Sequence, residues 1–98
     1  MASRTITTAA EELFLRNRYR KSFVIQNEDV AIDIYIKQER DGALAVSTTN
    51  HDHRLRAGAA LAVNFGTDGI EAIQDRWTII AASGTPRIAY FETEDIIR

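Results

Sequence analysis

The chain of 98 residues has no cysteine, a single proline, five glycines and two histidines. Without cysteine it can form neither a disulfide framework nor a thiolate metal site, which leaves the redox compartment open. No apolar run approaches the roughly 18 residues of a membrane span, and residues 1–15 lack the apolar region of a secretory signal. With so little proline and glycine, turns must rely on Asn, Asp and Ser, and long flexible linkers are not expected. These absences predict one soluble domain, made and folded in the cytoplasm, with no membrane partner.

Charge and motif content argue against an enzyme. Twelve basic and fourteen acidic side chains give a net charge of −2, so the whole surface does not attract nucleic acid. The sequence has no glycine-rich phosphate loop, and Ser83 lacks the strand–turn–helix context of a nucleophile elbow. The carboxylate pairs Glu11/Glu12 and Glu92/Glu94 are interpreted as solvated surface. We therefore predict no catalytic activity and no cofactor.

The two histidines are the remaining candidates for chemistry. His51 and His53 flank Asp52, and as a strand this segment places both imidazoles on one side. A structural or catalytic metal needs three or four convergent ligands, and no second cluster of ligands occurs in the sequence. Residues 50–53 are therefore predicted to form an exposed polar loop with no metal.

The strongest structural pattern lies at residues 20–37. Phe23, Val24 and Ile25 form an apolar run that ends in the polar residues 26–29. Aliphatic residues then alternate with others at Val30, Ile32, Ile34 and Ile36. This period of two puts four β-branched side chains on one face of a strand. The pattern predicts a hairpin of two strands joined by a polar turn.

Similar signals recur along the rest of the chain. Further strands are predicted at residues 43–49, 59–65, 77–81 and 87–93, and tight turns at 39–42 and 82–85. Residues 9–15 have helical propensity, but Leu13, Phe14 and Leu15 are consecutive and cannot share a helix stripe, which favours a turn or strand. The total of about six to eight short strands, without a βαβ rhythm, predicts an all-β fold: an antiparallel β-sandwich or jelly roll over residues 11–98.

The N-terminal residues 1–10 are small, rich in threonine and anchored by a lone apolar residue, Ile6. They are compatible with an edge strand or an extended arm, and we assign them as an arm outside the domain. Such an arm can order on a neighbouring molecule by strand addition, so Ile6 and Thr7 are candidate partner contacts.

Residues 16–21 (RNRYRK) are the one concentrated positive segment. If extended, Arg16, Arg18 and Arg20 share one face and Tyr19 lies opposite. The segment fits a solvated edge that prevents aggregation, a docking patch for an acidic protein, or a nucleic-acid contact. Four charges and one aromatic ring are little for a nucleic-acid site. The candidate partner-binding residues are therefore Arg16, Arg18, Tyr19 and Arg20, with a protein as the partner.

Three segments carry a family resemblance. Residues 20–27 (RKSFVIQN) with the alternation at 30–36 resemble the R-x-S-x-x-I-Q-N opening of small virion proteins from tailed bacteriophages. Residues 55–58 (LRAG) resemble the L-x-x-G element that follows in that family. Residues 79–85 (IIAASGT) with 88–92 resemble its closing strand pair. In this chain residues 70–75 replace a loop that carries Pro and Gly in relatives.

The resemblance implies a β-sandwich that joins a phage particle without catalysing a reaction. The role it implies first is that of a capsid decoration (cement) protein on the capsid surface. Such a protein is made in the host cytoplasm and binds the major capsid protein or another virion protein. A homo-oligomer is implied, with a trimer favoured over a dimer. Contact residues do not transfer, because the shared motif is a fold motif.

Two other classes of function are compatible with the sequence. A neck or tail component, or a carbohydrate- or receptor-binding module of a phage fibre, is the first alternative. A glycan site requires exposed Trp77 or tyrosines (Tyr19, Tyr35, Tyr90) as stacking platforms, whereas we expect Trp77 and Phe91 in the core. A hydrolase or metal enzyme using His51 and His53 is the second alternative.

Overall fold

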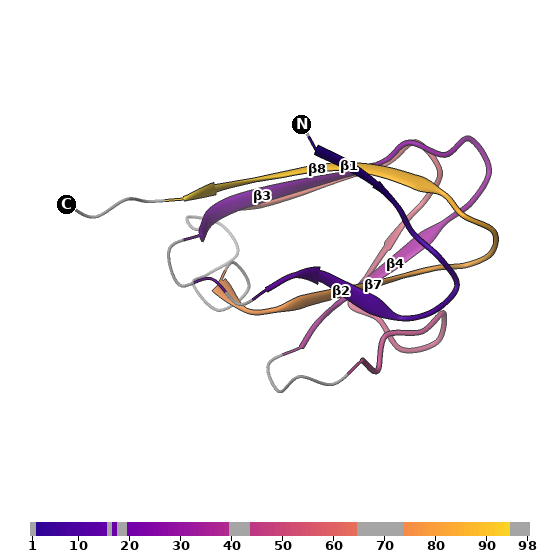
Figure 1. The fold of residues 1–98 in the computed structure, drawn as a ribbon, viewed down its shortest axis with the longest axis horizontal. Helices are drawn as coiled ribbons and strands as arrows, with labels where there is room; N and C mark the ends of the chain where they lie inside the picture. The colour runs from indigo at the N-terminus through magenta and orange to yellow at the C-terminus, as the bar shows by residue number, and fades with distance from the viewer. Residues whose placement is uncertain (1, 16, 18–19, 40–43, 65–73, 95–98) are drawn as a thin grey trace.

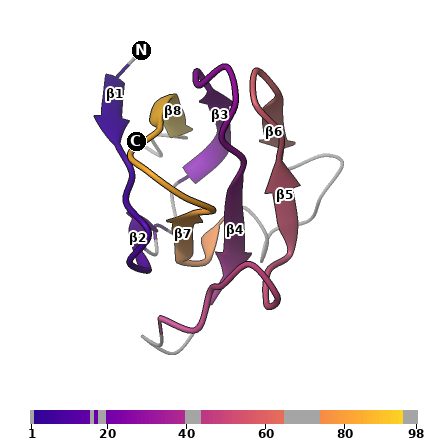
Figure 2. The same cartoon turned by 90° about the vertical axis from the view of Figure 1, so that its right-hand side faces the viewer.

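The computed structural model describes residues 2–15, 17, 20–39, 44–64 and 74–94 (Figure 1). The described residues form two four-stranded antiparallel sheets packed face to face, so the prediction of an all-β sandwich is confirmed. Sheet A has the order β1-β8-β3-β6 and sheet B the order β2-β7-β4-β5 (Figure 2). The strands are β1 (Ala2–Thr5), β2 (Glu11–Phe14), β3 (Arg20–Asn27), β4 (Ile34–Gln38), β5 (His53–Leu55), β6 (Ala60–Asn64), β7 (Trp77–Ala81) and β8 (Arg87–Glu94).

Alternating side chains from both sheets fill the space between them. Fully buried residues include Phe23 and Ile25 of sheet A and Ile34, Ile36 and Ile79 of sheet B. This alternation is the strand period that the sequence displays, and burying each of these side chains contributes roughly 1.5–3 kcal/mol. The core therefore comes from the positions that the period of two selects.

A row of aromatic rings crosses the core. Phe14 packs between Tyr90 and Phe23, with ring centroids 5.8 and 4.9 Å away, and Phe23 contacts Trp77 at 5.3 Å. Trp77 is 2% exposed, which confirms its expected place in the core. The same expectation is wrong for Phe91, which is 38% exposed, because it alternates with the inward-facing Tyr90 and so lies on the outer face of sheet A.

The predicted hairpin at residues 20–37 is wrong in topology. Its first strand is β3 and its second is β4, but they belong to different sheets, and residues 28–33 cross between them. The second strand begins at Ile34, and Val30 is 95% exposed. The Asp29 carboxylate accepts the backbone N–H groups of Ala31 (2.8 Å) and Ile32 (2.9 Å). These bonds hold the crossing as a turn, in which the alternation of Val30 and Ile32 has no strand to join.

The strand predicted at residues 43–49 is also absent from the part that the structure describes, residues 44–49. Ser47 and Asn50 form an isolated bridge, and Glu39 Oε1 accepts the N–H of Ala45 at 2.9 Å. Small side chains give this segment little to pack against a sheet. Its loop continues to His51, whose ring lies 4.5 Å from that of Tyr35 on the outer face of sheet B. The loop thus covers part of that face.

The assignment of residues 1–10 as an arm is wrong for the described residues 2–10. β1 pairs with β8 from Ala2↔Tyr90 to Thr5↔Arg87, which is the edge-strand alternative. Ile6 is fully buried and its N–H donates to the carbonyl of Pro86 at 2.8 Å. One isoleucine anchors the segment firmly because it points into the closed core. The sandwich therefore begins at β1 rather than at residue 11.

Other predicted elements are confirmed. The strands expected at 59–65, 77–81 and 87–93 correspond to β6, β7 and β8, and residues 9–15 contain β2. A register shift between Glu12 and Phe14 lets the consecutive residues Leu13 and Phe14 both face the core. Gly84 serves the turn after β7 with φ of 58°, and a Cβ there would lie 3.0 Å from the Ile32 side chain.

Candidate interaction surfaces

The sandwich has two open sides, where the edge strands of its sheets face each other (Figure 2). The edge strands β1 and β2 lie on one side, and β5 and β6 lie on the other. We call these the β1/β2 side and the β5/β6 side. Each contains a hollow lined by residues of both sheets, and they differ in chemistry.

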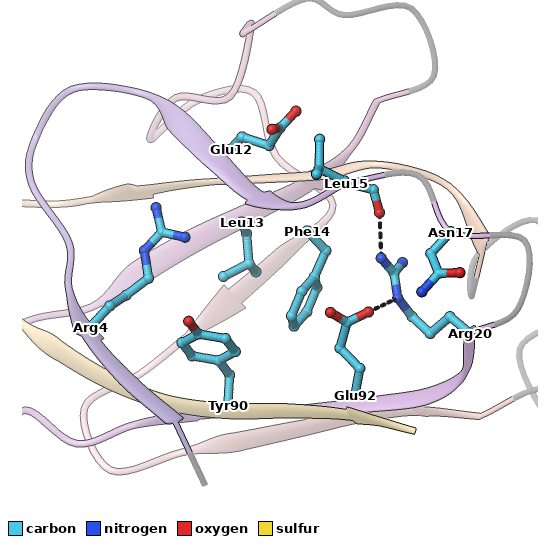
Figure 3. Close-up of a pocket in the computed structure, with 9 residues that line it drawn as sticks. All are labelled: Arg4, Glu12, Leu13, Phe14, Leu15, Asn17, Arg20, Tyr90 and Glu92. Atoms are coloured by element: carbon cyan, nitrogen blue, oxygen red, sulfur yellow. Dashed lines mark hydrogen bonds and ion pairs between the residues drawn. The ribbon is translucent and has the colours of Figure 1, made fainter. Parts of the chain in front are cut away.

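The hollow on the β1/β2 side has a volume of about 500 Å³ (Figure 3). Leu13, Phe14 and Tyr90 line its apolar part. Arg4 of β1 donates to Glu11 of β2 at 2.7 Å, and this pair joins the edges of the two sheets. A second pair joins Arg76 and Glu12. The charges that line this side therefore act within the chain. Its full lining is Arg4, Glu12, Leu13, Phe14, Leu15, Asn17, Arg20, Tyr90 and Glu92.

Arg20 is the buried cation of this side. Its side chain is 1% exposed, and its Nε donates to Glu92 Oε2 at 2.6 Å. The guanidinium also donates to the carbonyls of Asp75 (3.0 Å) and Leu15 and lies 5.0 Å from the centroid of the Phe14 ring. The backbone carbonyls and Glu92 thus share the hydrogen bonds that a buried guanidinium requires.

The prediction that Arg20 presents its charge to a partner is therefore wrong for the described structure. The cause is local: the pairing of β3 with β8 shifts register between Arg20 and Ser22. Strict alternation with Phe23 and Ile25 would turn Lys21 inward, but Lys21 is exposed and Arg20 is buried.

The remaining predicted contacts are scattered. Arg16, Arg18 and Tyr19 lie outside the described residues. Ile6 is a core residue, so it cannot reach a partner from this structure. Thr7 is exposed, although its Oγ1 accepts the N–H of Ala9 at 3.2 Å. The structure does not gather these residues into one described site.

The β5/β6 side has a smaller hollow of about 300 Å³. Leu61, Val63 and Trp77 supply apolar surface, and Asp52 and His53 lie at its polar margin. The Asp52 carboxylate accepts the backbone N–H of Gln38 at 2.8 Å. β6 itself (ALAVN) carries no charged residue. Sequence reasoning identified the strand but not its edge position, because the order of strands in a sheet is not encoded by a strand's own pattern.

Asn27 connects β3 to the β5/β6 side. Its side-chain amide is fully buried and donates to the carbonyls of Ile32 (2.8 Å) and Leu55 (3.1 Å). Its Oδ1 accepts the N–H of Asp29 at 3.1 Å. Its backbone N–H donates to Ala59, and its carbonyl accepts from Gly58. The neutral amide therefore joins the crossing loop at residues 28–33 to the end of β5, and the backbone of Asn27 holds the connection between β5 and β6.

The two histidines lie on different sides of sheet B. His51 stacks on Tyr35, which faces outward, and its Nδ1 is 3.2 Å from the carbonyl of Ser47. His53 begins β5, opposite the inward-facing Ile36, with its ring 6.0 Å from Trp77. The possibility that both imidazoles share one side is therefore wrong. Within the described ranges, no three metal-ligating side chains gather in one place.

The outer faces of the two sheets also differ. On sheet A, alternation with the buried positions turns small or uncharged side chains outward: Ser3, Thr5, Ser22, Val24, Gln26, Ala60, Ala62, Ala89, Phe91 and Thr93. Arg87 lies at one end of this face, where it donates to Ser3 Oγ at 2.9 Å, and the exposed Lys21 of β3 lies at the other end. On sheet B, Lys37 and Arg54 face outward and the loop at residues 44–52 covers Tyr35. Arg54 donates to Asp33 at 2.9 Å, and this bond lowers the pKa of the Asp33 carboxyl.

These surfaces offer apolar area and backbone hydrogen-bonding groups, which is the chemistry of protein–protein contact. Among the described residues, no helix has the length and apolarity that a membrane span requires. Comparison with protein-family models, curated proteins and solved structures found no match for this chain.

Proposed function

We propose that the protein is a structural component of a tailed-bacteriophage virion, a capsid decoration protein that binds across neighbouring major capsid subunits and stabilises the head. The observation that carries the proposal is how the three segments of the family resemblance pack. The segment at residues 20–27 pairs along β8, and Asn27 at its end bonds to Leu55 and Gly58 of the 55–58 segment. The resemblance therefore falls on positions that depend on each other physically, and a β-sandwich is the fold that it implies.

We assign the capsid contact to the outer face of sheet A. A protein surface that meets another protein gains most from apolar and aromatic groups that lose little hydration, and charged groups are depleted at the centre of such contacts. Phe91 lies at the centre of this face, opposite Val24 in the pairing of β3 with β8. The covered and charged outer face of sheet B fits this role less well.

A cement function follows from linked binding. A protein that binds the assembled shell, but not separate subunits, stabilises the assembly in proportion to its occupancy. Each contact can be weak, because many copies act on one particle. A folded sandwich whose strands are already paired in two sheets orders few residues when it binds, which keeps the entropic cost of binding low.

The glycan-binding alternative loses its principal residues. Trp77 is 2% exposed, and Tyr35 is 9% exposed beneath the ring of His51. Tyr90 faces inward toward Phe14. Tyr19 lies outside the described residues. The number of copies per particle distinguishes a decoration protein from a neck or tail component. A decoration protein is present in proportion to the capsid subunits, whereas a neck or tail protein is present in few copies.

The test is binding of the purified protein to expanded phage capsids that lack their decoration protein, measured by co-sedimentation. We expect saturation at a fixed number of copies per capsid subunit. Phe91→Asp places a charge at the centre of the contact and should lower occupancy at least about tenfold. Val30→Asp is the control, because Val30 is 95% exposed on the crossing loop at residues 28–33 and not on a strand of sheet A. Absence of saturable binding by the wild-type protein would overturn the proposal.

A further inference from the structure

The four edge strands differ in how they are protected against pairing with another chain. β1 has four residues and carries Arg4. β2 has four residues, two glutamates and a register shift. β5 has three residues and carries Arg54. β6 has five uncharged residues and pairs with β3 in unbroken register from Ser22↔Asn64 to Gln26↔Ala60. Short length, charge and bulges are the usual protections of a sheet edge, and β6 has none of them.

The ladder shows which backbone groups β6 presents. The N–H of Asn27 donates to the carbonyl of Ala59 at 2.9 Å, so Asn27 and Ala59 form a hydrogen-bonded pair. Hydrogen-bonded pairs recur at every second residue of an antiparallel ladder, which directs the groups of Leu61 and Val63 toward β3. The N–H and C=O groups of Ala60, Ala62 and Asn64 consequently point to the free edge. Within the described residues these groups have no partner.

The side chains of β6 alternate between the two faces of sheet A. Ala60 and Ala62 are exposed on the outer face of sheet A. Leu61 and Val63 face inward, and Leu61 remains half-buried. The hollow of about 300 Å³ on the β5/β6 side is lined by Leu61, Ala62 and Val63. An added strand would thus gain hydrogen bonds along the edge and room for inward-facing aliphatic side chains beside it.

We propose that the free edge of β6 pairs with β6 of a second copy of this chain, antiparallel and centred on Ala62. In this register Ala62 faces Ala62 of the second copy, and Leu61 faces its Val63. Small side chains then meet on the outer face and aliphatic side chains meet beside the hollow. Because the strand carries no charge, two identical edges do not repel each other. Sheet A continues through both chains as one eight-stranded sheet.

The pattern of β6 favours a second copy as the occupant, because two identical uncharged edges meet without repulsion and the register centred on Ala62 pairs all five residues of the strand. A two-fold contact of this kind closes at two chains, whereas the family resemblance favours three. One five-residue edge buries less than the roughly 800 Å² per partner of a standard stable interface, so a weak, concentration-dependent dimer is expected. This inference is independent of capsid binding.

The first experiment is sedimentation equilibrium of the full chain from about 10 µM to 1 mM, the range where weak interfaces associate. The apparent mass should rise from 11.0 kDa toward twice that value. Ala62→Lys places two cations at the two-fold axis and should raise the dissociation constant at least about tenfold. Ala62→Thr, which keeps an uncharged side chain with good strand propensity, is the matched control and should still associate. Circular dichroism checks that each variant is folded.

A second experiment remains informative if Ala62→Lys does not fold. The chain has no cysteine, so Ala62→Cys introduces one thiol. Residues opposite each other in a hydrogen-bonded antiparallel pair have Cα atoms about 5.5 Å apart, within the range of a disulfide. Mild oxidation should yield a covalent dimer much faster than for Ser83→Cys, an exposed position in the turn after β7.

Three results would overturn the inference. The first is a wild-type chain that stays monomeric at 1 mM, which would leave the edge to a strand of another protein. The second is equal cross-linking of Ala62→Cys and Ser83→Cys. The third is a dimer that Ala62→Lys does not weaken.

Discussion

The two open sides of the sandwich are closed by different chemistry. On the β1/β2 side, Arg4 pairs with Glu11 between the sheets and the buried Arg20 pairs with Glu92. On the β5/β6 side, the neutral amide of Asn27 and aliphatic side chains perform the same task. Charged residues also protect the edges β1 and β2, while β6 is uncharged. The comparison teaches that ion pairs use the charges of the β1/β2 side within the chain, whereas the neutral contacts of the β5/β6 side leave the edge strand β6 without a charged residue.

The two sides also differ in how much folding free energy is lost when one hydrogen-bonding partner is removed. A buried guanidinium is favourable only while carboxylate and carbonyl partners replace its lost hydration, so removal of one partner is costly. A buried amide loses less on burial and correspondingly less when its hydrogen bonds are broken. The comparison can therefore be tested by substituting the residues that close each side, one at a time, and measuring stability.

The largest effect is expected for Arg20→Ala. This change leaves Glu92 and two carbonyl groups without their donor and removes the cation over Phe14. We expect a loss of about 3 kcal/mol in the free energy of unfolding, at the low end for a broken buried pair because Glu92 is one-third exposed. Urea unfolding followed by Trp77 fluorescence measures this. Arg20→Lys should lose less, because it keeps the charge but not the fork of donors. A loss below about 1 kcal/mol for Arg20→Ala would contradict ionic closure.

Asn27→Ala tests the neutral closure. It removes two donated bonds and one accepted bond from a fully buried site. The unfolding free energy should fall by about 2–3 kcal/mol, since the carbonyls of Ile32 and Leu55 lose their partners. Gln26→Ala, one residue away on the outer face, should change stability by less than about 0.5 kcal/mol. Equal effects of the two substitutions would show that the amide network does not hold this side together.

The Arg4–Glu11 pair should contribute much less than Arg20. Both side chains are about 30% exposed, at 31% and 30%, so water screens their attraction. A double-mutant cycle with Arg4→Met and Glu11→Gln should give a coupling energy of about 0.5 kcal/mol. The coupling should shrink as salt rises from 0.05 to 0.5 M. A coupling that is large and insensitive to salt would mean that this pair, rather than Arg20, closes the β1/β2 side.

The smallest effect concerns Asp33, which pairs with Arg54 on the outer face of sheet B. The hydrogen bond from Arg54 lowers the pKa of this partly buried carboxyl in the folded state. Its stabilising contribution is therefore complete above the unfolded pKa of about 4 and disappears as the pH falls through the lower folded pKa. Asp33→Asn should be slightly less stable than the wild type at pH 7, and the difference should vanish in acid. Thermal unfolding at pH 7 and below pH 3 measures this. A difference that grows in acid would contradict the assignment.

Local patterns predicted the strands well where a strand packs in the ordinary way. β7 was predicted with its observed bounds, because its alternation and the turn that follows are local signals. The pattern at Val30 and Ile32 was misleading, because the Asp29 side chain holds these residues in a crossing turn. Arg20 was misassigned for a similar reason: one register shift reverses the side to which a residue points. The register shift has no signature in residue type, and the turn residue Asp29 does not show whether the chain returns to the same sheet or crosses to the other.

The sequence by itself determined that the chain forms an antiparallel β-sandwich without disulfides, because strand period and composition are local properties that each segment carries. Only the tertiary structure decided which strands became edges, which arginine was buried and that the uncharged strand β6 lies at an edge. Those outcomes depend on contacts between residues distant in the sequence, such as Arg20 with Glu92 and Asn27 with Leu55. The physical reason is that the position of a strand in a sheet is set by what all the other strands bury.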